Sequence, residues 1–416
     1  MLFDSGIIRN YDIRGEYGKD FDDEFAKLLG AAVVAQFKAK TLVVARDERE
    51  SSTVLAQAVI KGITASGCDV IDIGVASTPF FYYVVTNKNV PAGIMITASH
   101  MGEAFNGFKI CKHDGMVLAK ETGLPELMEL LPDTLGQGKG NITTPDFRDE
   151  HADVVIKHSG LVPGESTMRV ALEAGDMIRK EFEPIAKKLN LAYVQNSPDI
   201  IFVFDADGDR ILVKNKAGDL IRGDLIGGLI ASRMNYRTVV YDIRYSRGVV
   251  EYLVALNIRL VPSRIGHTLI KKAMRDADAD FCGEGSGHTM FKVMNSVESA
   301  MLLALLVLKI LATEKKTIGE LVQPMQTWCL NYEINIPIAG WPNSVPAILE
   351  KVKAHYQDAK VSELDGLKVD YPDWWFLLRA SSNDPVIRLI VEAKTKELVE
   401  EKTKEVQALI IVPSSA

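Results

Sequence analysis

The sequence predicts an α/β protein in which two or three successive α/β units precede a smaller α+β domain. Three observations predict this class. Short apolar segments alternate with helical segments between residues 41 and 96, this order resumes between residues 200 and 313, and apolar and polar residues alternate one by one after residue 331. Parallel strands need a crossover helix between them, whereas strands of an antiparallel sheet with one solvated face show the one-by-one alternation.

The first unit is predicted from five segments in the order strand, helix, strand, helix, strand. They are TLVVA at 41–45, a helix over 51–65, VIDI at 70–73, a helix over 78–86 and GIMI at 93–96. This order implies a parallel sheet with helices on both faces. The stretch from Pro132 to Pro145 is rich in Gly, Thr and Pro, so we expect a linker there.

The later segments repeat this order and then change in character. Strands are expected at 200–204, 238–241 and 259–262, and helices at 224–234, 247–256, 268–277 and 298–313. Further strands are expected at 331–338, 374–378 and 386–393, where the residues alternate. The last part therefore favours a small α+β domain on an antiparallel sheet.

Length and charge limit the classes of protein. The chain has 416 residues, which at about 100–200 residues per domain predicts about two to four domains. Its formal net charge is −7, and no basic block interrupts the sequence. A nucleic-acid partner is therefore not expected, because such proteins carry a Lys- and Arg-rich face. A phosphorylated ligand would need local positive pockets instead.

The cysteines and apolar segments predict a cytoplasmic protein. The four cysteines lie far apart and form no CxxC pair, so we expect buried reduced thiols rather than a zinc site or disulfides. The N-terminal residues show no signal-peptide pattern. The longest apolar run, 300–308, is too short to span a bilayer, so no membrane partner is expected.

The first cluster of candidate functional residues is the segment from Thr97 to Lys109. It follows the predicted strand at 93–96, at the edge where open α/β sheets bind ligands. Ser99 and His100 place a nucleophile beside an acid/base group. An amide, a glycine that allows close approach and a fixed cation follow at Asn106, Gly107 and Lys109. A polar loop without chemistry is the alternative interpretation.

The second cluster is DADGDR, which begins directly after the predicted strand at 200–204. Its three carboxylates, Asp205, Asp207 and Asp209, converge on one cation if the loop curls at Gly208. Oxygen ligands suit a hard ion such as Mg²⁺ or Ca²⁺. An EF-hand is excluded because its terminal Glu is absent and a strand precedes the loop. An acidic turn remains the alternative.

Two further clusters carry groups that bind sugars and phosphates. GEGSGH, at 283–288, offers a carboxylate, a hydroxyl and an imidazole to a polyol. RASSNDPVIR, at 379–388, offers guanidinium, hydroxyl and amide donors that could surround a phosphate. Read separately, the first is also compatible with a plain turn and the second with a charged loop between two strands.

Taken together, these clusters resemble the α-D-phosphohexomutase family, and within it the phosphomannomutase/phosphoglucomutase branch. Seven motifs stand in the order of that family. They are YDIRG (11–15), ARDERESS (45–52), TASH followed by NGFK (97–109), DADGDR (205–210), RIGH (264–267), GEGSGH (283–288) and RASSNDP (379–385). The resemblance covers nearly the whole chain, and seven ordered motifs are far more specific than any one of them.

The resemblance implies a fold class and a set of domain boundaries. The expected fold is α/β, with three successive α/β domains of mixed, mainly parallel sheets around a central cleft, plus a C-terminal α+β domain. The expected domains are 1–145 with the phosphoserine loop, 146–220 with the metal loop, 221–328 with the sugar loop and 329–416 with the phosphate loop. The second is shorter than the resemblance leads us to expect.

The resemblance also implies a reaction. Ser99 would carry a phosphoryl group, pass it to a sugar monophosphate and receive the other phosphate of the bisphosphorylated sugar. Mg²⁺ would be held by Ser99, Asp205, Asp207 and Asp209, with hexose 1,6-bisphosphate as activator and intermediate. The enzyme would be an intramolecular phosphotransferase acting on hexose 1- and 6-phosphates of mannose or glucose, as a monomer or homodimer.

The remaining site residues take their expected roles from the same resemblance. Acid/base or charge-stabilising roles at the reacting groups fall to Arg14, His100, Lys109, Arg210 and His288. Substrate contacts fall to His267, Glu284, Ser286, Arg379, Ser381, Asn383 and Arg388, of which Glu284 and Ser286 would bind sugar hydroxyls and the last four the non-reacting phosphate.

Two departures from the family pattern keep alternatives open. Met101 and Gly102 replace the Asn-Pro that usually follows the Ser-His pair, and the second domain is short. These departures motivate the alternative hypothesis that the protein is a non-catalytic homologue that binds a sugar phosphate. Phosphoglucosamine mutase is a further alternative, because the middle residue of the sugar loop, Gly285, matches neither enzymatic branch.

Overall fold

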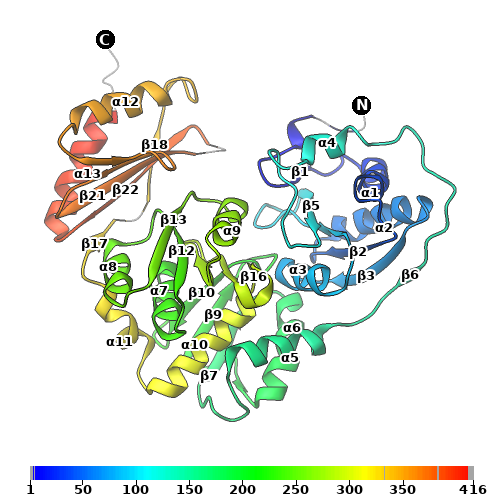
Figure 1. Cartoon of the computed structure of the whole chain (residues 1–416), viewed down its shortest axis with the longest axis horizontal. Helices are drawn as coiled ribbons and strands as arrows, with labels where there is room; N and C mark the ends of the chain where they lie inside the picture. Colours follow the sequence, from blue (N-terminus) through cyan, green and yellow to red (C-terminus); the bar gives the residue numbers. More distant parts are fainter. Residues whose placement is uncertain (1–2, 4, 332, 382–383, 411–416) are drawn as a thin grey trace.

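The structure is a computed structural model that describes residues 3, 5–331, 333–381 and 384–410. Four β-sheets follow one another along the chain. In Figure 1 they lie along an arc, from the N-terminal sheet in blue and cyan to the C-terminal sheet in orange and red. Helices cover the sheets, as the alternating segments predict.

The first sheet has the strand order β1-β5-β4-β2-β3-β6. Its strands are β1 (Ile13–Glu16), β2 (Thr41–Arg46), β3 (Asp69–Val75), β4 (Ala92–Ile96), β5 (Phe105–Lys112) and β6 (Ile142–Thr143), and its helices are α1 (Asp23–Phe37), α2 (Glu50–Ala65), α3 (Thr78–Asn87) and α4 (Leu124–Met128). Alternate residues of β2 face opposite layers, so Leu42 and Val44 share a core with α1 and α2 while Val43 and Ala45 pack with α3.

Two features of this sheet differ from the sequence prediction. Residues 105–112 form strand β5, which pairs antiparallel with β4 and β1, so Asn106, Gly107 and Lys109 lie on a strand rather than in a loop. The expected linker from Pro132 to Pro145 contains strand β6, which extends the sheet beside β3. The mixture of parallel and antiparallel pairs places Lys109 beside β4, opposite Met95.

The second sheet has the order β11-β10-β9-β7-β8. Its strands are β7 (Arg169–Glu173), β8 (Ala192–Tyr193), β9 (Ile200–Phe204), β10 (Ile211–Asn215) and β11 (Leu220–Ile221), and its helices are α5 (Arg148–Ser159) and α6 (Asp176–Leu189). Strand β9 is parallel to β7 and antiparallel to β10. The DADGDR loop is therefore the tight connection between β9 and β10.

The third sheet has the order β13-β12-β14-β15-β16. Its strands are β12 (Thr238–Asp242), β13 (Arg259–Ser263), β14 (Phe281–Gly283), β15 (Thr289–Phe291) and β16 (Val297–Glu298), and its helices are α7 (Gly223–Arg233), α8 (Arg247–Ala255), α9 (His267–Asp276), α10 (Ala300–Glu314) and α11 (Ile318–Val322). Helix α10 packs against both α7 and α5, so it joins the second and third sheets. Its nearly uniform apolar composition suits this buried position.

The fourth sheet is antiparallel, with the order β17-β22-β21-β20-β19 and β18 paired to β22. Its strands are β17 (Cys329–Leu330), β18 (Ile334–Pro337), β19 (Lys360–Ser362), β20 (Leu367–Asp370), β21 (Trp374–Ala380) and β22 (Val386–Ala393), and its helices are α12 (Val345–His355) and α13 (Lys396–Ile410). Mixed α/β sheets followed by this antiparallel sheet confirm the predicted fold class.

Two smaller predictions concern cysteines and membrane spans. All four cysteines are free thiols, and three are buried while Cys329 is half-buried. Within the described residues, no helix combines the length and the apolar character needed to cross a membrane.

Candidate active site

The serine loop, residues 97–102, begins at the carboxyl end of β4. Its central residue, Ser99, is 4% exposed and has a φ of +52°, in the left-handed region. The Ser99 amide donates to Thr97 Oγ1 at 2.9 Å, and Ser99 Oγ lies 3.4 Å from His100 Nδ1. The nucleophile predicted from the sequence is thus held at a strand end beside an imidazole.

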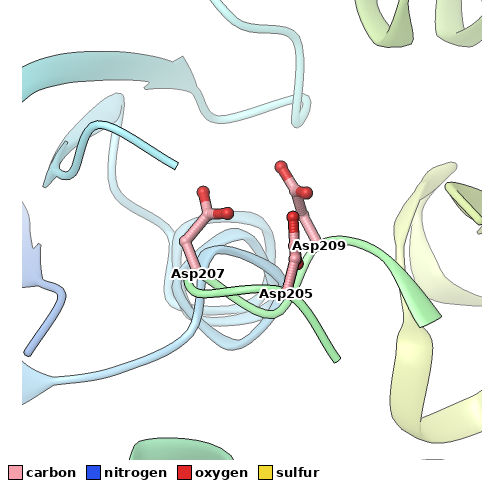
Figure 2. A group of neighbouring side chains, drawn as sticks. All are labelled: Asp205, Asp207 and Asp209. Carbon is pink, nitrogen blue, oxygen red and sulfur yellow. The ribbon is translucent and has the colours of Figure 1, made fainter. Parts of the chain in front are cut away.

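The metal loop, residues 205–210, brings three carboxylates together as predicted. One oxygen from each of Asp205, Asp207 and Asp209 lies within 4.8 Å of the other two. Figure 2 shows the three side chains on one loop, pointing to the same side of it. Gly208 makes the curl possible, because its φ is +72° and a Cβ there would lie 2.3 Å from Ile178 Cδ1.

The carboxylates of the metal loop fit a hard divalent cation. Asp205 Oδ2, Asp207 Oδ1 and Asp209 Oδ1 are buried and accept no hydrogen bond from the described residues. Burial and the two neighbouring carboxylates raise the pKa of Asp205 to about 8. Buried carboxylate oxygens without donors are costly unless a cation compensates them, and an all-oxygen set suits Mg²⁺.

Lys109 connects the first sheet to the metal loop. Its Nζ donates to Asp207 Oδ2 at 2.7 Å and to Asp209 Oδ2 at 3.0 Å, and the side chain is only 3% exposed. Burial opposes the charged ammonium, but the two carboxylates outweigh it and raise the pKa of Lys109 well above its ordinary value. The fixed cation expected from the sequence therefore faces the metal loop.

Arg210 and two histidines from the third sheet complete this group. Arg210 Nε donates to His288 Nε2 at 3.1 Å, and the His288 and His267 rings stack with centroids 5.9 Å apart. Burial lowers the pKa of His267 well below its ordinary value. Burial also lowers the pKa of His100, as do the guanidinium groups of Arg210 and Arg14, which therefore lie near the serine loop.

The sugar loop, residues 283–288, is fixed by hydrogen bonds within the third sheet. Glu284 Oε1 accepts from the Gly266 amide at 3.0 Å, and Glu284 Oε2 accepts from Ser286 Oγ at 2.9 Å. The Gly285 amide donates to the buried carboxylate of Asp242 at 2.8 Å. Glu284 is 3% exposed, so its carboxylate is held in one orientation beside the start of α9.

The predicted phosphate residues form a second group on the fourth sheet. Arg379 pairs with Asp365 at 3.1 Å, and the same carboxylate accepts from the Ile265 amide at 2.9 Å, which ties this group to the loop before α9. Arg388 pairs with Glu333 and reaches Ser381 Oγ at 3.4 Å. Asn383 lies outside the described residues.

Arg14 is held on β1 by Asp12. Its Nε donates to Asp12 Oδ2 at 3.1 Å, and a second nitrogen of the same guanidinium contacts that oxygen. In the register of β1 and β5, Arg14 lies opposite Gly107. The buried carboxylate of Asp12 therefore holds the Arg14 guanidinium in place near the serine loop.

Several residues that contact the site have no predicted role in the sequence analysis. Thr78, the first residue of α3, donates from Oγ1 to Asp207 Oδ2 at 2.9 Å. Its neighbour Ser77 donates to both oxygens of Glu181 at 2.7 Å. Arg49 donates to the backbone of the serine loop. The Thr-Pro pair predicted the start of α3, and the ARDERESS motif contains Arg49, but neither assigned these residues a role in the site.

Comparisons with known proteins match most of this chain to one family. Models of the phosphoglucomutase/phosphomannomutase family match residues 6–130 as alpha/beta/alpha domain I, 222–328 as alpha/beta/alpha domain III and 333–409 as the C-terminal domain. A phosphomannomutase of Methanocaldococcus jannaschii is 29% identical over 99% of this chain and 98% of its own length. A phosphomannomutase of Escherichia coli strain K12 is also 29% identical, over 96% and 98%.

Solved structures share the fold at lower identity. A phosphoglucomutase/phosphomannomutase family protein from Burkholderia thailandensis gives a TM-score of 0.86 at 24% identity, covering 98% of each chain. The open form of a phosphoglucomutase from Paramecium, parafusin, gives 0.75 at 14% identity, covering 98% of this chain and 96% of that one.

The alignment with the Methanocaldococcus relative also shows a difference in length. It extends over 448 residues, more than the 416 of this chain, so the relative has residues that this chain lacks. The second sheet lies between the first two matched ranges. Since the matched domains span most of the sequence, the chain belongs to the phosphoglucomutase/phosphomannomutase family of α-D-phosphohexomutases.

Proposed function

We propose that this phosphohexomutase interconverts hexose 1-phosphate and hexose 6-phosphate through a phosphoserine at Ser99 and a bisphosphorylated sugar. One observation carries the proposal. Three buried carboxylate oxygens of the metal loop accept no hydrogen bond from the described residues, and Lys109 joins this loop to the sheet that positions Ser99. A nucleophile beside a cation site is what phosphoryl transfer requires, because positioning and charge neutralisation dominate its catalysis.

Mg²⁺ is the cation that we assign to this site. Asp205, Asp207 and Asp209 would hold it together with an oxygen of the phosphoryl group on Ser99. A bound Mg²⁺ neutralises negative charge on the phosphoryl group in transfer. A solved N-acetylphosphoglucosamine mutase structure from Aspergillus fumigatus contains magnesium and GlcNAc-6P, which supports this assignment for the wider fold.

The transfer step involves one bond formed and one bond broken. A sugar hydroxyl oxygen bonds to phosphorus while the bond between phosphorus and Ser99 Oγ breaks, and the hydroxyl proton leaves as Ser99 Oγ regains one. His100, 3.4 Å from Ser99 Oγ, is placed to handle that proton. Lys109 and Arg210, with Arg14 nearby, hold the charge that spreads over the phosphoryl oxygens.

The remaining residues would orient the sugar. Glu284 and Ser286 bind sugar hydroxyls, because they present a carboxylate and a hydroxyl on a fixed loop. His288, the last residue of this loop, accepts a hydrogen bond from Arg210 of the metal loop, and its ring stacks with that of His267. Arg379, Ser381, Asn383 and Arg388 bind the phosphate that does not react. The bisphosphorylated sugar reorients between the two half-reactions. Each of its phosphates therefore occupies, in turn, the site formed by Arg379, Ser381, Asn383 and Arg388.

The names of the relatives support mannose and glucose phosphates as the substrates. The two relatives at 29% identity are phosphomannomutases. The N-acetylphosphoglucosamine mutase structures match less well, with TM-scores of 0.57 and 0.53, and one of them contains glucose 1,6-bisphosphate. We therefore place hexose 1,6-bisphosphate here as the activator. The free thiols fit a reducing compartment, and we place the enzyme in the cytoplasm.

A coupled assay with a panel of sugar 1-phosphates tests the proposed function. The protein is mixed with Mg²⁺, a trace of hexose 1,6-bisphosphate and the 1-phosphate of mannose, glucose or glucosamine. We expect turnover of mannose or glucose 1-phosphate to exceed that of glucosamine 1-phosphate and to vanish in Ser99→Ala. Faster turnover of glucosamine 1-phosphate would instead indicate a phosphoglucosamine mutase. The absence of turnover with every sugar phosphate would contradict the proposal.

A further inference from the structure

The backbone of the nucleophile adopts a conformation that a non-glycine residue rarely takes. Ser99 has a φ of +52°, where its Cβ crowds the chain. Such a conformation costs free energy and persists only where surrounding contacts impose it. Two hydrogen bonds within the loop contribute, from the Ser99 amide to Thr97 Oγ1 at 2.9 Å and from the Met101 amide to the Ala98 carbonyl at 3.2 Å. Contacts from outside the loop add to this restraint.

Arg49 provides contacts of this kind. One nitrogen of its guanidinium, Nη2, donates to the carbonyl oxygen of Ser99 at 2.8 Å and to that of Met101 at 2.5 Å. The two carbonyls lie on either side of His100, so one group fixes the loop on both sides of the acid/base residue. Arg49 is 7% exposed, and buried donors of this kind hold their acceptors firmly.

The guanidinium is itself fixed from the opposite side. Its Nη1 contacts Asp47 Oδ2, and Asp47 Oδ1 accepts from the Arg49 amide at 3.1 Å and from Ser52 Oγ at 2.5 Å. Asn106 on β5 then donates to Ser52 Oγ at 2.9 Å. Arg49 stands directly before α2, so the start of this helix holds it, and β5 supports Asp47 through Ser52.

We propose that Arg49 is a positioning residue, which sets the direction of Ser99 Oγ for phosphoryl transfer through the two loop carbonyls. The inference rests on the proposed function of Ser99. An ordinary buried ion pair with Asp47 would need only Nη1, whereas Nη2 bonds to residues about fifty positions away in the sequence. Arg49 touches neither the metal loop nor a substrate group, so it acts through Ser99.

The test compares kcat and KM of the Arg49→Ala and Arg49→Lys variants with those of the wild-type enzyme. A misplaced nucleophile slows the chemical step, so we expect kcat of R49A to fall about 100-fold while KM changes much less. R49K keeps the positive charge but lacks the planar guanidinium group, so its kcat should lie between that of the wild type and that of R49A. Arg46→Ala, on the preceding strand and without contact to the loop, is the matched control and should keep the wild-type kcat.

Chemical rescue separates positioning from a general loss of structure. Guanidinium ion at millimolar concentration should restore part of the kcat of R49A, whereas methylammonium should not. An R49A enzyme with the wild-type kcat, or an R49K enzyme with the wild-type kcat, would overturn the inference. So would a loss of activity that follows the loss of thermal stability and that guanidinium does not restore. If R49A does not fold, R49K alone decides by its kcat.

The same experiment distinguishes this inference from the proposed function. If the wild-type enzyme turns over no hexose phosphate, the proposed function fails. If the wild type is active and R49A is equally active, only the role of Arg49 fails.

Discussion

At the scale of single residues, the site depends on charged groups that hold one another. Lys109 shares its ammonium between Asp207 and Asp209, and Asp207 also accepts from Thr78. Each carboxylate of the metal loop keeps one buried oxygen that accepts no hydrogen bond from the described residues, although Arg210 Nε lies 3.6 Å from Asp205 Oδ2. The loop therefore has satisfied oxygens that fix its shape and unsatisfied oxygens that are available to a cation.

Replacing Asp207 by Asn tests the cation site. The variant loses a charged ligand but keeps the size of the side chain, so we expect Mg²⁺-dependent kcat to fall at least about 100-fold while the melting temperature stays near the wild-type value. Asp219→Asn, an exposed carboxylate beyond β10, is the control and should leave kcat unchanged. Unchanged turnover in D207N would remove the metal loop from the mechanism.

Arg379 tests the second group of site residues. It would hold the non-reacting phosphate in both the ground and the transition state, so Arg379→Ala should chiefly raise KM for the hexose phosphate. Steady-state kinetics at saturating bisphosphate measure this. A large fall in kcat with an unchanged KM would contradict the role assigned to Arg379.

The sequence indicated the residues that we propose to carry the chemistry, but not those that hold them in place. Ser99, Asp205 and Lys109 stand in short motifs whose spacing is visible along the chain. Thr78 and Glu181 have no such signal, because their partners lie 129 and 104 positions away and meet them only when the first and second sheets pack together. Contacts between sheets are set by the folded packing, which local spacing does not encode.

At the scale of elements, helix α3 connects the nucleophile's sheet to the metal loop. Its start contacts Asp207 through Thr78 and helix α6 through Ser77 and Glu181. The same helix packs on β2 and β4, and β4 leads into the serine loop. One element therefore sets the distance between Ser99 and the cation site.

Thr78→Val tests this connection. The variant keeps the shape of the side chain but removes the hydrogen bond to Asp207 Oδ2. Loss of a partner behind a metal ligand commonly weakens metal affinity by about 10–100-fold, so we expect the Mg²⁺ concentration at half-maximal activity to rise in that range. Thr86→Val, on the last turn of α3, serves as the control. An unchanged Mg²⁺ dependence in T78V would show that α3 does not position the metal loop.

Glu181 gives the contact between α3 and α6 a pH dependence. Burial raises the pKa of Glu181 to about 7, against an ordinary value of 4.5. The folded protein therefore keeps a proton between pH 4.5 and pH 7 that the unfolded chain loses. This contribution to stability is present in full below pH 4.5 and is lost as the pH rises through 7, by up to about 3 kcal/mol.

Urea unfolding of Glu181→Gln at pH 5 and pH 8 measures that contribution. The unfolding free energy of the wild type should fall relative to that of E181Q between the two pH values. Glu183→Gln, exposed on the same helix, should follow the wild type. An identical pH dependence for E181Q and the wild type would contradict the raised pKa of Glu181.

The elements themselves were largely predictable, with an instructive exception at β5. The parallel strands β2, β3 and β4 are short apolar runs between helical segments, and they lie where the sequence predicts them. Strand β5 contains Asn106, Gly107 and Lys109, so its polar and small residues suggested a loop. They are tolerated there because Lys109 is paired with carboxylates and Asn106 with two serine hydroxyls.

At the scale of the whole molecule, buried polar contacts fix how the sheets pack on one another. Lys271 on α9 is fully buried, pairs with Glu298 Oε2 at 2.8 Å and donates to the carbonyl of Gly115, in the turn after β5, at 3.2 Å. Its ammonium also lies 4.5 Å from the centre of the Tyr82 ring on α3. Because α9 begins at His267, this contact helps to hold a site residue relative to the serine loop.

Lys271→Met tests whether this contact stabilises the assembly of the first and third sheets. Removing one partner leaves Glu298 buried without its counter-charge, which should lower the unfolding free energy by about 3–5 kcal/mol. Lys272→Met, on the exposed side of the same helix, should have little effect. Equal stability of the two variants would contradict the role of Lys271, and the double variant with Glu298→Gln should recover part of the loss.

Ser99, the central residue of the serine loop, is proposed to carry the phosphoryl group. Intact-mass analysis after incubation with Mg²⁺ and hexose 1,6-bisphosphate tests it most directly. We expect one added phosphoryl group per chain, located at Ser99 by peptide mapping and absent in Ser99→Ala. If the wild-type protein gains no phosphoryl group, or if the S99A variant gains one to the same extent, Ser99 does not carry the phosphoryl group.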